Sequence, residues 1–203
     1  GGLPAATSGQ PDNGSASGSA TYAKSFQGSL FLGDSITEGL IYHDVLEEDN
    51  VIAGAGKTAQ IALETGNAED IVRRKPETVY IQLGSDDLLW PTDDPQSYSL
   101  SHYAQLIDKL RTGLPEAGIT LLSVMPVTAE TEKLEPRYRN IAAYNEGLKQ
   151  LAAEKQVGYI DLAPLAAEHS DLYDEDGIHF QEAFYPLLLA YVQAAADPRP
   201  GAE

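Results

Sequence analysis

Several residue types are scarce or absent in this chain of 203 residues, which contains no cysteine, one methionine and one tryptophan. The absence of cysteine excludes disulfides, thiolate metal sites and a cysteine nucleophile. Basic residues are few, because 13 Lys and Arg face 31 Asp and Glu and leave a net charge of −18. The phosphates of nucleic acids need a basic surface, so we expect no nucleic-acid partner.

Long apolar runs are also lacking. No stretch approaches the roughly 18 apolar residues of a membrane-spanning helix, so we expect no transmembrane segment. Apolar residues still make up 42% of the chain, which is ordinary for a globular protein. The length is sufficient for one domain with a full hydrophobic core.

The first 28 residues differ in composition from the rest. They are rich in Gly, Ser, Ala, Pro, Asn and Gln and contain few large apolar side chains, a composition typical of flexible linkers. We therefore predict a flexible tether over 1–28 and a single folded domain over 29–203. Such a tether suits a secreted or cell-surface-anchored protein whose signal or anchor is not in this chain; a cytoplasmic protein with a disordered tail is the alternative.

Strand-like and helix-like segments alternate from Ser29 onward. Strands are expected at 29–33, 50–53, 78–83, 119–125 and 158–162, and helices at 37–46, 59–64, 68–75, 99–114, 138–155 and 183–196. This alternation with short connections predicts an α/β fold in which helices cover both faces of a parallel sheet.

Small or polar residues follow four of the predicted strands. Ser35 follows the first strand, Gly56 the second, Asp86 the third, and an acidic loop that includes Asp176 and His179 the fifth. The carboxyl ends of parallel strands lie at one edge of a sheet, where ligands bind in such folds. We therefore expect these residues to converge on one crevice.

Ser35 permits two interpretations. A serine between a strand and a helix is commonly a helix N-cap. It could instead be a nucleophile, which needs a base within hydrogen-bond reach and donors for an oxyanion. Asp176 and His179 are three residues apart, a spacing that makes them neighbours on a helical turn. The aspartate could orient the imidazole, whose other nitrogen would accept the proton of Ser35. Taken together, the three residues favour the nucleophile.

These motifs resemble the conserved blocks of the SGNH, or GDSL-type, hydrolases (esterases and lipases). Gly33-Asp34-Ser35 matches the first block, which holds the nucleophile, and Asp176-Gly177-Ile178-His179 matches the last, Asp-x-x-His. Gly56 sits where the family's second-block glycine donates its N–H to the oxyanion. The resemblance covers roughly 29–196 and implies a flavodoxin-like three-layer α/β/α sandwich with five parallel strands.

The resemblance also implies an activity. Ser35, Asp176 and His179 would hydrolyse carboxylic esters through an acyl-enzyme, without a metal or cofactor. The expected substrates are small acyl esters, for example acetyl esters of carbohydrate. Longer acyl chains, as in a lysophospholipase or thioesterase, and a non-catalytic glycan- or ester-binding protein are the alternatives. Trp90 follows the third strand and either lines the acyl or alcohol pocket or packs on the rim of the domain.

Asp86 departs from the family pattern, which has an asparagine as an oxyanion donor at this position. An ionised carboxylate has no proton to donate. It would repel an oxyanion 4 Å away by about 4 kcal/mol at an effective dielectric constant near 20. Three possibilities remain open: Asp86 is protonated because of burial and neighbouring aspartates, it points away from the site, or the protein is a weak enzyme or a binding protein.

Overall fold

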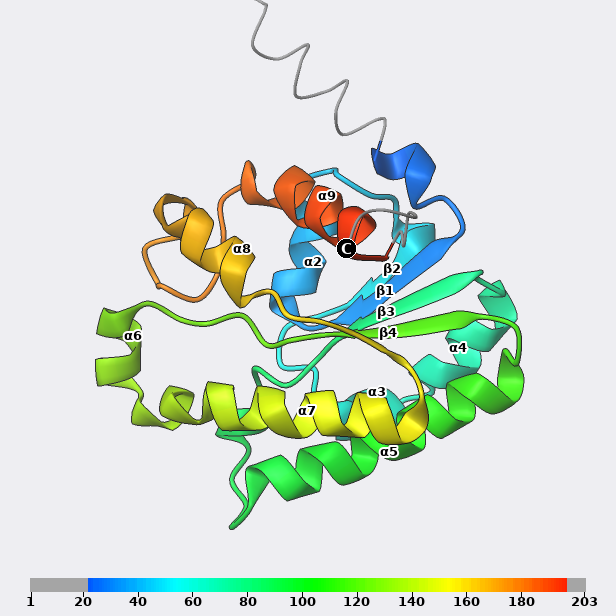
Figure 1. Ribbon diagram of the computed structural model, residues 1–203, viewed down its shortest axis with the longest axis horizontal. Helices are drawn as coiled ribbons and strands as arrows, with labels where there is room; N and C mark the ends of the chain where they lie inside the picture. Colours follow the sequence, from blue (N-terminus) through cyan, green and yellow to red (C-terminus); the bar gives the residue numbers. More distant parts are fainter. Residues whose placement is uncertain (1–21, 197–203) are drawn as a thin grey trace, which may run out of the picture.

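Five parallel strands form a single sheet in the computed structural model, which describes residues 22–196. The strand order is β2-β1-β3-β4-β5 (Figure 1). The strands are β1 (Ser29–Gly33), β2 (Val51–Ala53), β3 (Thr78–Gln82), β4 (Gly118–Leu122) and β5 (Gly158–Ile160). The predicted α/β fold is therefore confirmed.

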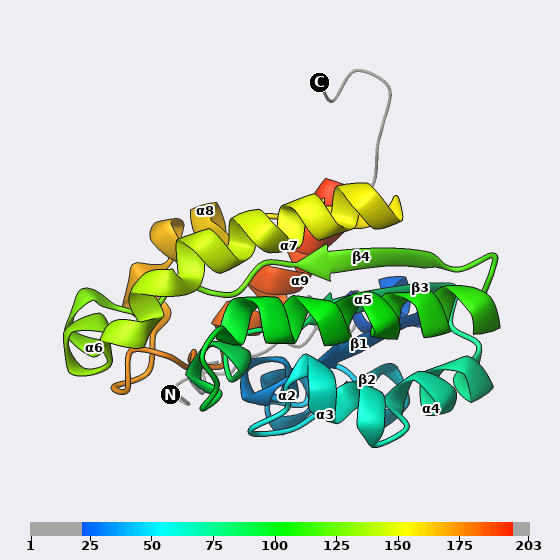
Figure 2. The same cartoon turned by 90° about the horizontal axis from the view of Figure 1, so that it is seen from below.

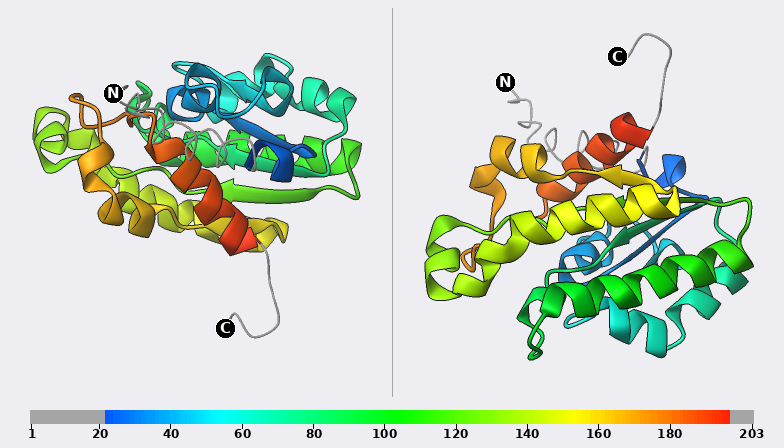
Figure 3. Two further views of the ribbon diagram at one scale, coloured as in Figure 1. Left: turned by 90° about the horizontal axis from the view of Figure 1, so that it is seen from above. Right: turned by 60° about the horizontal axis from the view of Figure 1, so that its bottom comes forward.

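Helices cover both faces of this sheet (Figures 1 and 2). One face carries α3 (Ala59–Glu64), α4 (Asn67–Arg74), α5 (Pro95–Gly113) and α7 (Ile141–Lys155), and the other carries α2 (Ser35–Tyr42), α8 (Ala163–Glu168) and α9 (Phe184–Ala196). The short helix α6 (Ala129–Leu134) lies beyond the carboxyl end of β4 (Figure 3). The three layers predicted from the family resemblance are thus present.

Side chains alternate across the sheet and build a hydrophobic core on each face. Leu30 and Leu32 of β1 pack into the core beneath α3, α4, α5 and α7, whereas Phe31 packs into the core beneath α2, α8 and α9. Val79 and Tyr80 of β3 divide between the two cores in the same way. Because both faces are buried, these strands read as nearly continuous apolar runs in the sequence.

The folded domain begins earlier than the predicted boundary at residue 28. Residues 22–25 form a helical turn, and Phe26 is only 3% exposed. The ring of Phe26 packs against Phe31 and Tyr80, with centroid distances of 5.5 and 5.9 Å. The Asn50 side chain also donates hydrogen bonds to three carbonyls of 26–29. Residues 22–28 therefore belong to the domain, and the rest of the predicted tether lies outside the described residues.

Other differences from the predicted elements have local causes. Helix α5 begins at Pro95 instead of Ser99 because Asp94 caps it, with Asp94 Oδ1 accepting the amide of Ser97 at 3.1 Å. Strand β4 ends at Leu122 because the next residues turn to other partners, including the side chain of Asn145, which bonds the amide of Val124 at 2.8 Å. The sequence interpretation missed α6, α8 and the 3₁₀ helices η1 (Glu48–Asn50), η2 (Asp87–Leu89), η3 (Pro136–Asn140) and η4 (Ser170–Leu172).

Across residues 22–196, none of the helices combines the length and the apolar character needed to cross a bilayer.

Candidate active site

The turn from β1 into α2 presents Ser35 at the carboxyl end of the sheet. Asp34, not Ser35, is the N-cap of α2, since its Oδ1 accepts the amide of Ile36 at 3.0 Å. Ser35 is the first residue of the helix. The N-cap interpretation of Ser35 is therefore wrong, and its hydroxyl is not used to cap the helix.

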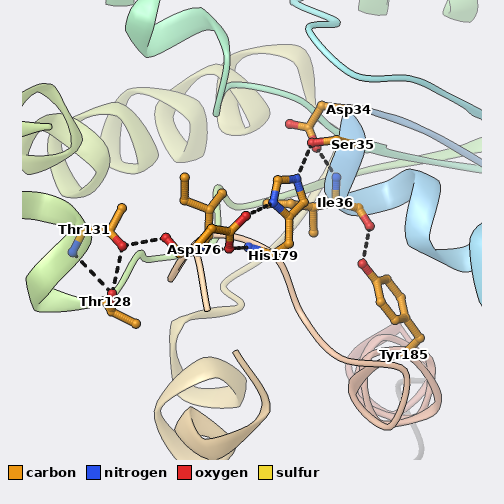
Figure 4. A network of polar contacts seen from close by, with 9 residues as sticks. Asp34, Ser35, Ile36, Thr128, Thr131, Asp176, His179 and Tyr185 are labelled. Carbon is orange, nitrogen blue, oxygen red and sulfur yellow. Dashed lines mark hydrogen bonds and ion pairs between the residues drawn. The ribbon is translucent and has the colours of Figure 1, made fainter. Parts of the chain in front are cut away.

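This turn is fixed by close packing and buried hydrogen bonds. A Cβ atom at Gly33 would overlap the Thr37 side chain and the backbone of β3, so only glycine fits there. Thr37 Oγ1 donates to Gln82 Oε1 at 2.8 Å and so links α2 to the end of β3. From the opposite side, the Tyr185 hydroxyl of α9 donates to the carbonyl of Ile36 at 2.7 Å (Figure 4). The backbone carrying Ser35 is thus held from three directions.

His179 and Asp176 meet Ser35 from a loop more than 140 residues later in the chain (Figure 4). Ser35 Oγ lies 2.8 Å from His179 Nε2, and His179 Nδ1 lies 2.5 Å from Asp176 Oδ2. With the Nδ1 proton donated to the carboxylate, Nε2 is free to accept the proton of the Ser35 hydroxyl. The three side chains expected to converge therefore form one continuous hydrogen-bonded chain.

Asp176 and His179 lie in a loop turn, not on the helical turn that the sequence interpretation assumed. Asp176 Oδ1 accepts the amides of Ile178 and His179 at 2.8 and 2.9 Å, and α9 begins only at Phe184. Gly177 has a φ of +69°, a conformation that favours glycine. An aspartate readily forms such a turn because its side chain bonds the backbone two residues on. Burial raises the pKa of Asp176, but the hydrogen bonds from the side chain and amide of His179 and from the amide of Ile178 hold it below its usual value overall.

The beginning of α6 supports this loop from outside. Thr131 Oγ1 donates to the carbonyl of Asp176 at 2.7 Å, and the amide of Thr128 donates to the carbonyl of Gly177 at 3.0 Å (Figure 4). A Cβ atom at Gly177 would overlap both threonine hydroxyls. Sequence reasoning missed both threonines; the only local signal was Thr128 as an N-cap three residues before Thr131.

Asp87 holds the loop that contains Gly56. Asp87 is 2% exposed, and its Oδ2 accepts the amide of Ala59 at 3.0 Å and the hydroxyl of Ser99 at 2.5 Å. Gly56 lies in this β2–α3 loop with a φ of +78° and is exposed. The loop is also joined to the end of β1, because the amide of Gly54 donates to the carbonyl of Gly33 at 3.3 Å.

Asp34, Asp86 and Asp87 form a group of interacting carboxyls near Ser35. Burial, followed by the charges of Asp86 and Asp87, raises the pKa of Asp34 to about 8. The pKa of Asp86 is raised by burial and by Asp87 and is lowered by His179. Asp86 therefore lies within electrostatic range of both Asp34 and His179.

A groove of about 490 Å³ opens beside Ser35 and His179, and its lining comes from α2, the 174–180 loop and Tyr185. Trp90 is not among the lining residues of this groove. It lines a separate small cavity with Thr58, Gln60, Asp87, Tyr98 and Ser99. The groove thus lies on the α2 side of Ser35, and Trp90, expected either in the pocket or on the rim of the domain, is not part of its lining.

In the described part of the chain, no three His, Asp or Glu side chains are grouped so that they could hold a metal ion.

Comparison with known proteins settles the family. The model of the GDSL-like lipase/acylhydrolase family matches residues 31–187. The chain belongs to this family. The match spans the nucleophile turn, the three aspartates and the Asp176–His179 loop, so the resemblance drawn from the motifs is confirmed.

Solved acylhydrolase structures share the fold. A GDSL-like lipase from Bacteroides thetaiotaomicron superposes with a TM-score of 0.67 at 16% identity, covering 92% of this chain and 96% of that one. An acetylxylan esterase from Geobacillus stearothermophilus superposes with a TM-score of 0.62 at 20% identity, covering 84% and 94%. No curated protein sequence matches the chain significantly. At these identities the structural likeness shows the fold, and family membership supports ester hydrolysis in general.

Proposed function

We propose that this acylhydrolase-family protein hydrolyses carboxylic esters of small acyl groups through an acyl-enzyme at Ser35. The observation that carries the proposal is the hydrogen-bonded chain from Ser35 Oγ through the His179 ring to Asp176, at 2.8 and 2.5 Å. A nucleophile, a base and a group that orients the base are thus within reach of one another.

In the acylation step, Ser35 Oγ attacks the ester carbonyl carbon while His179 Nε2 takes the hydroxyl proton. Asp176 stabilises the imidazolium that results. The tetrahedral intermediate then collapses, the bond to the alcohol oxygen breaks, and His179 returns the proton to that oxygen. Water then attacks the acyl carbonyl carbon while His179 Nε2 takes its proton. The bond between that carbon and Ser35 Oγ breaks, His179 returns the proton to Oγ, and the carboxylic acid leaves.

Three groups are candidates to stabilise the oxyanion. Ser35 is the first residue of α2, where a backbone N–H has no acceptor within the helix and the helix dipole favours negative charge. Gly56, in the loop held by Asp87, offers a second backbone N–H. Asp86 offers a third donor when its carboxyl is protonated, which its raised pKa favours.

The small-acyl assignment is supported by a structural neighbour, and the groove beside Ser35 offers no aliphatic lining to a long alkyl chain in either part of the ester. The lining of the groove consists of Ser35, Glu38, Gly39, Tyr42, His43, Asp174, His179, Phe180 and Tyr185 and contains no aliphatic side chain. A long alkyl chain needs a continuous apolar surface to be removed from water. One structural neighbour is an acetylxylan esterase, and acetyl is an acyl group of this short class.

The decisive experiment combines Ser35→Ala with a serine-directed phosphonate. We expect the wild type to hydrolyse p-nitrophenyl acetate and to be labelled once, at Ser35. Ser35→Ala should lose at least about 10⁴-fold in kcat and should not be labelled, and His179→Ala should lose nearly as much, because the two act as a unit. Ser101→Ala, at an exposed position on α5, is the matched control.

The acyl-chain length is tested with p-nitrophenyl esters from acetate to octanoate. We expect kcat/KM to fall as the chain lengthens. Full activity in folded Ser35→Ala would refute the nucleophile, and a maximum at octanoate would refute the small-acyl assignment alone.

A further inference from the structure

The groove beside Ser35 has an unusual charge distribution. Glu38 and Asp174 contribute two exposed carboxylates from opposite sides, one from α2 and one from the loop that carries His179. Among the described residues that line the groove there is no Lys or Arg. The electrostatic potential in the groove is therefore negative, in line with a chain whose net charge is −18.

Aromatic rings line the same groove from its rim to its floor. Tyr42 is 80% exposed at the rim, a high value for a large aromatic side chain. Its ring meets that of His43 edge-on at 4.9 Å, and His43 lies 5.3 Å from the ring of Tyr185. Tyr185 is 2% exposed and is fixed by its hydrogen bond to Ile36. The Tyr42 ring, with the partly exposed His43 beside it, is therefore the aromatic surface that a ligand entering toward Ser35 can contact, and Tyr185 supports it from the buried floor.

Aromatic faces flanked by carboxylates attract cations through two interactions. A cation gains from the quadrupole of a ring within about 6 Å, and quaternary ammonium groups are recognised in this way. The carboxylates add a Coulomb attraction that increases as the site excludes water. A neutral group of the same shape gains neither term, and an anionic group is repelled.

We propose that the groove binds the alcohol part of the ester and selects alcohols that carry an ammonium group. The inference rests on the proposed ester hydrolysis at Ser35, since it names the substrate class of that same site. Glu38, Asp174 and Tyr42 are the specificity-determining residues. None of them belongs to the proton-transfer chain of Ser35, His179 and Asp176.

A series of three acetate esters tests the proposal. Acetylcholine carries a quaternary ammonium, 3,3-dimethylbutyl acetate is its neutral isostere, and 2-sulfoethyl acetate carries a negative charge at a similar distance. We expect kcat/KM to decrease in that order, with acetylcholine at least about 10-fold better than the neutral isostere. The preference should shrink in 0.5 M NaCl, because salt screens the exposed carboxylates.

Charge-neutralising variants then assign the preference to the groove. Glu38→Gln and Asp174→Asn should each lower the ratio of acetylcholine to 3,3-dimethylbutyl acetate by about 3- to 10-fold. Tyr42→Leu should lower the same ratio by about 3-fold. Glu116→Gln removes an exposed carboxylate just before β4, at the opposite end of the sheet, and should leave the ratio unchanged.

The outcomes separate this inference from the proposed function. If the wild type hydrolyses the neutral ester as well as acetylcholine, or if Glu38→Gln and Asp174→Asn do not change the ratio, the inference is overturned and ester hydrolysis stands. If none of the three esters nor p-nitrophenyl acetate is hydrolysed, the proposed function falls and the inference falls with it. An ordered preference that both variants reduce supports the inference.

Discussion

The two sides of the candidate active site are built in contrasting ways. Ser35 stands on a turn whose neighbours Asp34 and Thr37 are 2% and 0% exposed and which contacts β3 and α9. His179 and Asp176 stand on a loop, where their side chains are 36% and 45% exposed. Ser35 is thus positioned by the core, and His179 by a few polar contacts at the surface.

Because of this difference, changes on the two sides should affect stability and activity to different extents. Changes around Ser35 disturb buried packing, so they should lower the stability of the whole domain. Changes around His179 disturb a loop whose local opening costs much less than global unfolding. They should therefore reduce the rate before they affect the melting temperature. The four predictions that follow test this contrast, beginning with the largest expected effect.

Asp86→Asn changes the residue that interacts electrostatically with both sides of the site. The amide is a neutral donor at every pH, so we expect ester hydrolysis at pH 8 to rise by about 10-fold or more, within the 10²–10³ typical of one oxyanion donor. The pKa of Asp86 is raised, so its carboxyl loses its proton as pH rises and the wild-type rate should fall on the alkaline side. The variant should not show that decline. A lower rate in folded Asp86→Asn would show that the carboxyl has its own role.

Thr131→Val removes the hydroxyl that donates to the carbonyl of Asp176 and keeps the shape of the side chain. We expect kcat for p-nitrophenyl acetate to fall by about 10-fold, since small displacements of a catalytic group are costly, while the melting temperature stays within about 2 °C. Thr131→Ser keeps the hydroxyl and should restore most of the rate. Equal losses in the two variants would contradict the role of this hydrogen bond, because Thr131→Ser keeps the donor.

Thr37→Val makes the equivalent change on the Ser35 side. It leaves Gln82 Oε1 buried without its donor, next to a Gln82 Nε2 that already has no partner among the described residues. An unsatisfied buried polar atom costs about 1–3 kcal/mol, which corresponds to a fall of roughly 2–10 °C in melting temperature for a domain of this size. A variant that loses activity but keeps its full stability would contradict the contrast between the two sides.

Asp34→Asn should have an effect on stability that is absent at about pH 4 and grows as pH rises toward about 8. The folded state raises the pKa of Asp34 to about 8 from an ordinary 3.8. The stability that the protonated carboxyl contributes is complete below about pH 4 and is lost as pH rises through 8. Asparagine keeps the capping oxygen and carries no charge. We expect the variant to melt several degrees above the wild type at pH 9 and no higher than the wild type at pH 4, as measured by thermal unfolding at both pH values.

Much of the fold could be predicted from the sequence because it depends on local patterns. The apolar runs around Phe31 and Tyr80 mark buried strands, and their alternation with helices predicts a parallel sheet. The N-terminal boundary was predicted wrongly because Phe26 is one of few large apolar residues in a polar stretch, and only its contacts with Phe31 and Tyr80 reveal that it is buried.

Some residues of the candidate site could likewise be found from the sequence, and others only from the structure. Ser35, Asp176 and His179 were found from their types, their spacing and their motifs. Thr131 was not, because its contact joins a side chain to a backbone carbonyl 45 residues away. Trp90 was placed by its position after β3, yet the groove opens on the other side of the nucleophile.

The sequence alone determined the order along the chain of the five strands and of the helices it identified, the excess of negative charge, and Ser35, Asp176 and His179 as candidate site residues. Only the tertiary structure decided that Asp34 caps α2 instead of Ser35, that the Asp176–His179 pair is formed by a loop turn, and that Glu38, Asp174 and Tyr42 share one groove. The physical reason is that backbone propensity and the periodic pattern of apolar residues depend on a few neighbouring residues, so they can be recognised in the local sequence. The direction of a side chain and the shape of a groove depend on which distant segments pack beside it.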